Sequence, residues 1–223
     1  MLFHRTFPDK RISTSRLAQI YRKRKIKYRS LIAAYYLTPK QQENRALLRR
    51  EVFPKIASLI DSKQRVFFCD ESVFSNKLFT RRVWSEQGQR QPTVPLQRVN
   101  YKAIAAIASI DTEGRVVSQA TYDHSVDADK FICYLKQLKA EAGGLPFTLC
   151  LDNMRAHHAK KVKDYCAENE IQLLFCPPYS SEFAPIERLW ALSKAIFRQK
   201  LIEGNKPKLS QAEVHELVRV SMA

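Results

Sequence analysis

The stretch "FTLCLDNMRAHH" (residues 147–158) joins an apolar run to a group of polar side chains. Its first five residues, Phe147–Leu151, predict a short buried strand. The run ends abruptly in Asp152 and Asn153. A carboxylate at this position is explained either by a solvated loop or by a metal ligand, and a hard metal ion needs further oxygen ligands at the same place. The rest of the chain supplies two acids that fit the second explanation.

The composition indicates a globular protein with a basic arm. The chain has 223 residues, of which 45% are apolar, and a net charge of +16. Residues 1–60 carry 15 Lys/Arg against 3 Asp/Glu, which predicts an arm that binds a polyanion, DNA or RNA foremost. No run of about 18 apolar residues and no signal-peptide pattern is present. We therefore expect an intracellular, DNA-associated protein without a membrane partner, in the nucleus of a eukaryote or the cytoplasm and nucleoid of a bacterium.

The N-terminal region is predicted to be helical. Residues 12–30 open with Ser/Thr capping candidates and predict one short basic helix, within an arm of residues 1–36, that contacts DNA. A solvated charged face or a localisation signal is the alternative. Residues 37–62 predict a linker helix with an N-terminal capping box, which Pro54 is expected to kink or split. The arm residues expected to bind DNA are Arg16, Arg22, Lys23, Arg24, Lys25 and Lys27.

Residues 63–223 have the pattern of a mixed α/β domain. Strands are predicted at 65–72, 76–86, 101–110 and 115–122, the last two as a hairpin. Helices and strands then alternate, at 127–142 (helix), 147–153 (strand), 158–170 (helix), 171–177 (strand), 185–202 (helix) and 209–220 (helix). This order favours a mixed sheet with flanking helices over a doubly wound parallel sheet.

Two further acids complete a candidate site with Asp152. Asp70 is predicted at the end of the strand at 65–72, and Glu187 in the first turn of the helix at 185–202, where the helix dipole favours a carboxylate. Adjacent strand ends open onto a shared crevice, so these acids are expected to meet. Three carboxylates repel one another unless a cation binds, and oxygen ligands select Mg²⁺, with Mn²⁺ as the alternative. Two such ions suit phosphoryl transfer.

Four stretches, in order, resemble the catalytic domain of mariner-like DDE transposases. They are "FFCDES" around Asp70, "RRVWSEQGQRQP" at 81–92, "LDNMRAHH" around Asp152 and "CPPYSSEFAPIERLW" around Glu187, with 34 residues between Asp152 and Glu187. The resemblance implies an RNase H-like fold and two Mg²⁺ ions held by these three acids. It implies cleavage of DNA at transposon ends and transfer of the freed 3′-OH into target DNA. We expect double-stranded DNA as the partner and a homodimer in the active complex.

The sequence also departs from this family. Ser181 and Ala184 stand where the family usually has Pro and Asn, and the basic helix resembles only the end of the second of two helix-turn-helix modules. Two other functions therefore stay open. One is a catalytically inactive DNA-binding or regulatory protein derived from such an enzyme, and the other is a different RNase H-like nuclease.

Supporting roles are predicted for residues near the acids. Asn153 is expected to orient Asp152 or bind phosphate, with a turn former as the alternative. Trp190 is expected to pack in the core and set the helix rotation that aims Glu187. Further phosphate contacts are expected from Arg81 and Arg82.

His157 and Glu71 receive separate interpretations. His157 resembles the family's histidine after Asp-Asn and is expected to contact DNA or the scissile phosphate, with a helix-start cap as the alternative. Glu71 adjoins Asp70 and faces the opposite side of any strand, which indicates a structural or supporting role.

Overall fold

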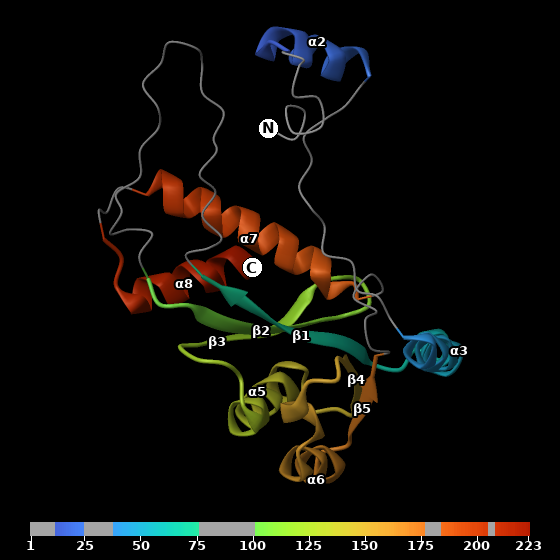
Figure 1. The fold of residues 1–223 in the computed structure, drawn as a ribbon. Coiled ribbons are helices and arrows are strands. Elements are labelled where there is room, and N and C mark those ends of the chain that lie inside the picture. Colours follow the sequence, from blue (N-terminus) through green and yellow to red (C-terminus); the bar gives the residue numbers. More distant parts are fainter. Residues whose placement is uncertain (1–11, 25–37, 76–100, 177–183, 205–207) are drawn as a thin grey trace. The chain divides into compact units, whose positions relative to one another are not determined.

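A computed structural model of the chain describes residues 12–24, 38–75, 101–176, 184–204 and 208–223. The chain divides into two compact units, Met1–Thr38 and Pro39–Ala223. The first unit contains helix α2 (Thr14–Lys23), whose N-cap is Ser13, and the second contains all other elements labelled in Figure 1. No helix within the described ranges is both long and apolar enough to cross a membrane.

The second unit is built on a five-stranded mixed sheet with the strand order β3-β2-β1-β4-β5. The strands are β1 (Val66–Phe74), β2 (Ile104–Ile110), β3 (Val116–Tyr122), β4 (Phe147–Leu151) and β5 (Ile171–Phe175). The first three pair antiparallel, and β4 and β5 run parallel to β1. This arrangement confirms the predicted mixed α/β, RNase H-like fold.

Local sequence explains where several helices begin and end. α5 (Ala128–Glu141) begins after Asp127, whose carboxylate accepts two backbone N–H groups of the first turn. It ends before Gly143, whose φ of +78° is rarely adopted by residues with a side chain. α8 (Gln211–Met222) begins with a capping box between Ser210 and Glu213. The other helices are α3 (Pro39–Asp61), the 3₁₀ turn η2 (Arg155–His158), α6 (Lys160–Glu168) and α7 (Ile186–Glu203).

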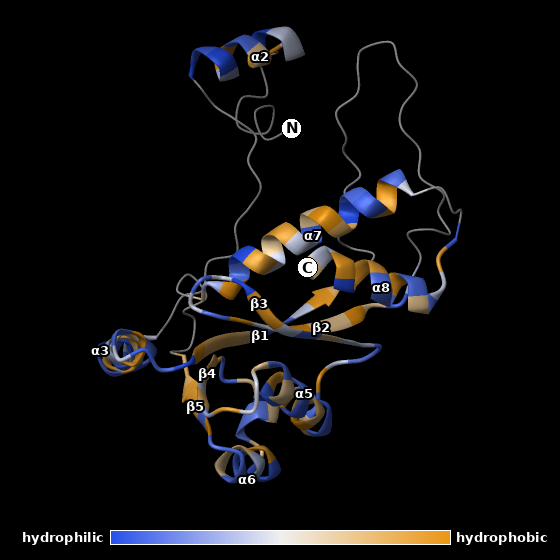
Figure 2. Ribbon diagram, turned by 180° about the vertical axis from the view of Figure 1, so that it is seen from behind, coloured by the Kyte–Doolittle hydropathy of each residue, from blue (hydrophilic) through white to orange (hydrophobic). Residues whose placement is uncertain are grey.

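Helices cover both faces of the sheet. Figure 1 shows α5 and α6 on one face and α7 and α8 on the other. On the second face α3 covers the β4–β5 side, where Val52 and Ile56 pack with Cys150 and Leu174. The central strand β2 is accordingly largely apolar (Figure 2), and every one of its residues is buried. A strand covered on both faces reads as a continuous apolar run, as this one does.

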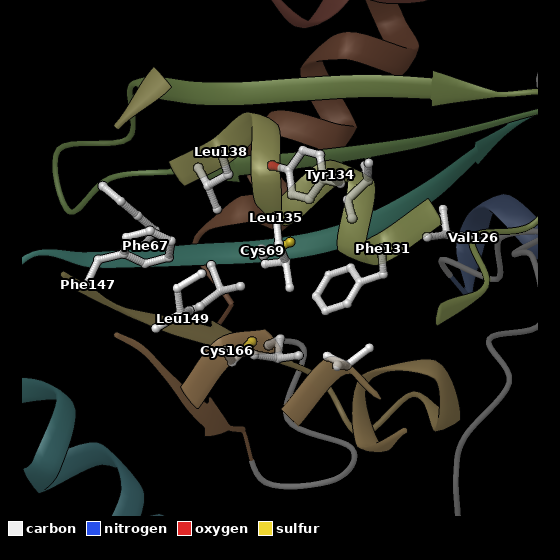
Figure 3. Packing of buried hydrophobic residues seen from close by; sticks show 14 of the residues in the cluster. Phe67, Cys69, Val126, Phe131, Tyr134, Leu135, Leu138, Phe147, Leu149 and Cys166 are labelled. Carbon is white, nitrogen blue, oxygen red and sulfur yellow. The ribbon is translucent and has the colours of Figure 1, made fainter. Parts of the chain in front are cut away.

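The core between the sheet and α5 contains one fully buried tyrosine (Figure 3). Tyr134 donates its hydroxyl hydrogen to Ser109 Oγ over 2.7 Å, and its oxygen lies 3.2 Å from the carbonyl oxygen of Ser118. Because a buried polar group without a partner is costly, these contacts allow the hydroxyl to lie among apolar side chains.

One predicted strand end is wrong, and of the two effects predicted for Pro54 the split is wrong. The first strand does not end at Asp70 but continues to Phe74, because its pairing with β2 extends as far as Phe74↔Ile104. Pro54 does not split α3, which is one continuous helix. Val52 and Ile56 on either side of it pack against the sheet, and such packing stabilises a helix in spite of one missing hydrogen bond. The predicted strand at 76–86 lies outside the described residues.

Candidate active site

The register of the two central parallel strands brings two of the predicted acids to the same level. The β1–β4 ladder ends at Phe68↔Cys150, and continuing it by two residues aligns Asp70 with Asp152. Asp70 lies within β1, where the backbone continues in its pairing with β2. Asp152 is the first residue after β4. The acids therefore stand where the two strands stop hydrogen-bonding to each other.

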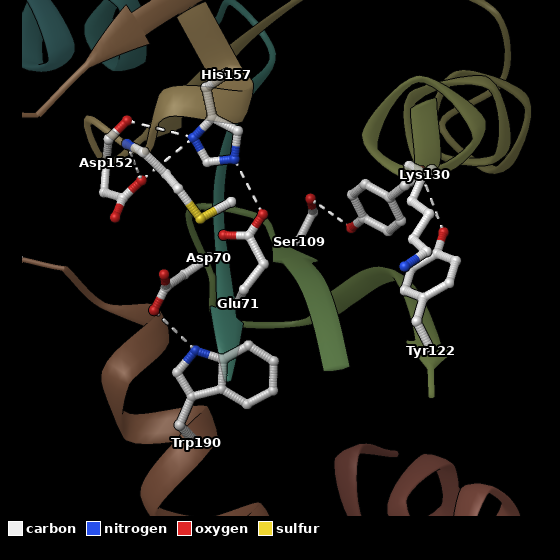
Figure 4. Close-up of polar contacts among 10 residues, drawn as sticks. Asp70, Glu71, Ser109, Tyr122, Lys130, Asp152, His157 and Trp190 are labelled. Atoms are coloured by element: carbon white, nitrogen blue, oxygen red, sulfur yellow. Dashed lines mark hydrogen bonds and ion pairs between the residues drawn. The ribbon is translucent and has the colours of Figure 1, made fainter. Parts of the chain in front are cut away.

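Asp70 is held by the helix on one face of the sheet. The indole Nε1 of Trp190 donates a hydrogen bond to Asp70 Oδ2 over 3.0 Å (Figure 4). Partial burial and the negative charges of Glu71 and Asp152 raise the pKa of Asp70 to about 7, although hydrogen bonds from the backbone N–H of Glu71 and from Trp190 oppose the rise. A cation beside Asp70 would relieve this unfavourable charge.

Asp152 is held through one of its two carboxylate oxygens. Oδ1 accepts the backbone N–H of Met154 over 2.9 Å and lies 3.2 Å from His157 Nδ1. The hydrogen bond from His157 lowers the pKa of Asp152, and burial opposes the lowering. The second oxygen, Oδ2, accepts no hydrogen bond from the described residues. Asp152 is thus an ionised carboxylate with one oxygen available for a ligand.

His157 lies between two carboxylates and is fully buried. Its Nε2 is 3.0 Å from Glu71 Oε1, and its ring packs on Phe131 with a centroid distance of 4.4 Å. Burial alone would lower the pKa of His157, but the hydrogen bonds to Asp152 and Glu71 outweigh it and raise the pKa to about 9. Because both ring nitrogens are engaged inside the protein, the geometry favours positioning of Asp152 over the predicted contact with DNA.

Glu187 lies in the first turn of α7, three residues before Trp190. Residues three apart on a helix are neighbours, so Glu187 is one turn from the side chain that contacts Asp70. Trp190 is buried and packs edge-on against Phe74, and its predicted role in aiming Glu187 stays a prediction. Glu187 itself is exposed, and the three predicted acids do not form one of the described groups whose ligand atoms all lie within 4.8 Å of one another.

Of the remaining predicted site residues, some are described by the structure and others are not. Asn153 donates from Nδ2 to the carbonyl oxygen of Cys176 over 2.7 Å, which ties the end of β4 to the end of β5. In α2 the basic residues Arg16, Arg22 and Lys23, with Arg24 directly after it, are exposed. Lys25, Lys27, Arg81 and Arg82 lie outside the described residues.

The donor atoms fit a hard cation better than a zinc ion. Asp70 and Asp152 both offer carboxylate oxygens, and oxygen ligands suit Mg²⁺ or Mn²⁺. Ligand atoms of Glu71, Asp152 and His157 also lie within 4.8 Å of one another. The imidazole there faces a carboxylate on both sides, however, so both nitrogens need their hydrogens and neither lone pair is free for a metal.

The link between Glu71 and His157 is the part of the site that the sequence did not reveal. Strand alternation predicts that Glu71 faces away from Asp70. The motif "LDNMRAHH" marks His157 as a candidate site residue. Their pairing joins positions 86 residues apart, and no local pattern reports such a contact.

Comparisons with known proteins identify the family and the fold of this part of the chain. Residues 65–209, more than half of the chain, match the family described as DDE superfamily endonuclease. The chain is similar to the crystal structure of the Mos1 mariner paired end complex with Mn, with a TM-score of 0.61 and 16% identity over 93% of this chain and 66% of that chain. It is similar to the catalytic domain of Mos1 mariner transposase, with a TM-score of 0.54 and 14% identity over 85% and 94% of the two chains.

A retroviral assembly shows the same fold. The simian T-cell lymphotropic virus intasome, in complex with PP2A regulatory subunit B56 gamma, gives a TM-score of 0.52 and 15% identity over 71% of this chain and 47% of that chain. The chain spans about two thirds of the Mos1 chain in the paired end complex. No curated protein matches the chain in sequence. At these identities the structural likenesses establish the fold.

Proposed function

Because the chain belongs to the DDE superfamily of endonucleases, we propose that it is a metal-dependent DNA transposase that cleaves DNA at transposon ends and transfers the freed 3′-OH strand into target DNA. The coarser assignment is firm, since the family match covers residues 65–209 and the fold is that of a transposase- and integrase-like catalytic domain.

The alignment of Asp70 with Asp152 is the observation that carries the proposal. The β1–β4 register sets the two carboxylates at one level, and the charge of Asp152 contributes to the raised pKa of Asp70. Each carboxylate is held by hydrogen-bond donors, Trp190 and the backbone N–H of Glu71 for Asp70, and His157 and a backbone N–H for Asp152. Such preorganised ligands suit an ion that needs a nearly fixed geometry.

The site residues would hold a pair of divalent ions, Mg²⁺ or Mn²⁺. When bound, such a pair activates the attacking oxygen and stabilises the leaving oxygen of a phosphodiester. Asp70 and Asp152 provide fixed oxygen ligands from the sheet. Glu187 would provide the third ligand from the first turn of α7, one turn from the Trp190 contact.

We propose double-stranded DNA as the partner, in the form of transposon ends and target. The exposed basic residues of α2 support contacts with backbone phosphate. Among the structural relatives, Mos1 transposase is seen in a strand transfer complex and in a paired-end complex with the left transposon end. For this chain a homodimer is the expected active form.

One observation favours a second candidate, a catalytically inactive DNA-binding protein derived from such an enzyme. Glu187 is exposed, the described acids do not bring three ligand atoms of Asp70, Asp152 and Glu187 within 4.8 Å of one another, and Glu187 follows the two family departures at Ser181 and Ala184. A chain of this kind would bind DNA but would not cleave it.

Cleavage of a plasmid carrying matched transposon ends separates the candidates. The wild-type chain should nick it with Mg²⁺ and not with EDTA, and Asp70→Asn, Asp152→Asn and Glu187→Gln should each abolish nicking while DNA binding is retained. The control is Asp164→Asn, which removes an exposed carboxylate from α6 and should leave nicking unchanged. Binding without nicking in the wild type would favour the inactive protein, and nicking that survives Asp152→Asn would contradict the proposed site.

A further inference from the structure

The two central strands part just before the candidate metal ligands. Backbone pairing between β1 and β4 ends at Phe68↔Cys150, two residues short of Asp70 and Asp152. Beyond that point the strands are joined by contacts between side chains. Glu71 Oε1 lies 3.0 Å from His157 Nε2, and His157 Nδ1 lies 3.2 Å from Asp152 Oδ1 and 3.4 Å from the backbone carbonyl oxygen of Asp152 (Figure 4).

We propose that Glu71 and His157 are positioning residues for Asp152, holding its Oδ1 so that Oδ2 is presented to the divalent ion. The inference rests on the proposed metal-dependent function. Neither residue touches the ion in this arrangement. Glu71 fixes the imidazole, and the imidazole fixes the rotation of the carboxylate.

Burial makes this link rigid. The His157 side chain has no exposed surface, and that of Glu71 is 14% exposed. The imidazole ring also packs on Phe131 at 4.4 Å, so it is confined from its face as well as from both nitrogens. A side chain fixed on three sides transmits its position to the group it contacts, which a solvated histidine would not do.

The position of the ring requires a partner at each end. His157 Nδ1 faces Asp152 and Nε2 faces Glu71, and both nitrogens are buried. A buried polar atom without a hydrogen-bond partner is costly, so Glu71 is needed to hold the imidazole from the side opposite to Asp152.

β1 thereby serves both ligands. Asp70 projects towards α7 and is met by Trp190, whereas Glu71, on the opposite face of the same strand, reaches Asp152 through His157. The relative position of the two ligands is set by one short piece of backbone, although no β1–β4 hydrogen bond reaches that level.

Mn²⁺ binding to the full chain tests this without DNA or turnover. Free Mn²⁺ is measured by electron paramagnetic resonance for the wild type, Glu71→Met, Glu71→Gln and His157→Asn. Loss of an outer partner of a metal ligand typically costs roughly 10–100-fold in affinity, which is the weakening expected for Glu71→Met. Glu71→Gln keeps an acceptor for the imidazole and should retain most of the affinity. His157→Asn keeps a donor near Asp152 but does not reach Glu71, and should fall between the two.

The two substitutions of Glu71 separate positioning from charge. Both remove one negative charge, so a purely electrostatic role would weaken Mn²⁺ binding equally and overturn the proposal. In an Asp152→Asn background, Glu71→Met should weaken binding no further, and an undiminished effect there would also overturn it. Chemical denaturation of each metal-free variant measures stability separately.

Two further outcomes have distinct meanings. Lower stability of Glu71→Met with unchanged Mn²⁺ affinity would show that the link only joins β1 to η2, which overturns the positioning role and leaves the proposed function intact. A folded wild-type chain that binds no Mn²⁺ would overturn the proposed function, and this inference with it.

Discussion

The indole Nε1 of Trp190 lies 3.0 Å from Oδ2 of Asp70, across 120 residues of sequence. This hydrogen bond joins the first turns of α7 to the middle of β1. It fixes one oxygen of the candidate ligand, and it fixes the helix turn next to Glu187. Both effects follow from the same N–H group, so a substitution that removes only that group is informative.

Trp190→Phe should keep much of the aromatic packing against Phe74 and remove the N–H donor. Loss of a donor to a largely buried carboxylate should lower the free energy of unfolding by about 1–3 kcal/mol. The pKa of Asp70 should rise further, since the lost hydrogen bond lowers it. Denaturant unfolding and NMR titration of Asp70 measure the two effects. In an Asp70→Ala background the stability loss should shrink, and an equal loss there would assign it to packing alone.

The metal-free chain should lose stability as pH rises from about 4 to 7 because of Asp70. Its pKa is raised to about 7 in the folded chain from 3.8, so the folded state binds more protons in this window and the free energy of unfolding falls with pH. Asp70→Asn should remove a difference on the order of a few kcal/mol between these pH values. Unfolding in EDTA at several pH values measures it. Mg²⁺ should stabilise the wild type more at pH 7 than at pH 4, because protons compete for the ligand; equal stabilisation would contradict binding at Asp70.

Tyr134→Phe should destabilise the chain without changing its fold. The substitution removes a fully buried hydroxyl that contacts Ser109 Oγ and the Ser118 carbonyl oxygen. A loss of about 1–2 kcal/mol in the free energy of unfolding is expected, because Ser109 is left without this partner in the core. The double variant Tyr134→Phe/Ser109→Ala should be less destabilised than the sum of the two single variants. Additive losses would show that the two hydroxyl groups do not interact.

The basic arm should give affinity for DNA with little sequence preference. Contacts between basic side chains and phosphate release counterions, so affinity falls steeply with salt and carries no base information. Neutralising Arg22, Lys23, Arg24 and Lys25 together should flatten the salt slope by up to about 0.9 per lost phosphate contact. Neutralising the exposed pair Lys160 and Lys163 on α6 is the matched control and should change the slope less. A strong preference for one duplex that survives high salt would identify the arm as a sequence-specific reader.

Local features of the fold could be predicted from the sequence because their causes lie within a few residues. The apolar run Phe147–Leu151 forms β4 and stops where Asp152 begins. The Asp127 cap and Gly143 bound α5 through contacts and backbone angles of their own neighbourhood. The three acids are likewise indicated by local features, namely strand ends, a helix start and the motifs around them. Their joint role as ligands stays a prediction.

Tertiary structure decided how the site is assembled. Asp70 lies inside β1 and not at its end, because the pairing of β1 with β2 continues to Phe74. β2 begins only at Ile104, so this pairing is not visible in the sequence around Asp70. The contacts that fix the two aligned acids, Trp190 with Asp70 and Glu71 with His157, span 120 and 86 residues. Periodicity and capping depend only on neighbours in sequence. They therefore predict the helices and strands and place the charged residues on them, but they do not predict contacts between distant residues. Which side chains hold the two carboxylates, Trp190 for Asp70 and His157 for Asp152, is decided only when the sheet and its helices pack.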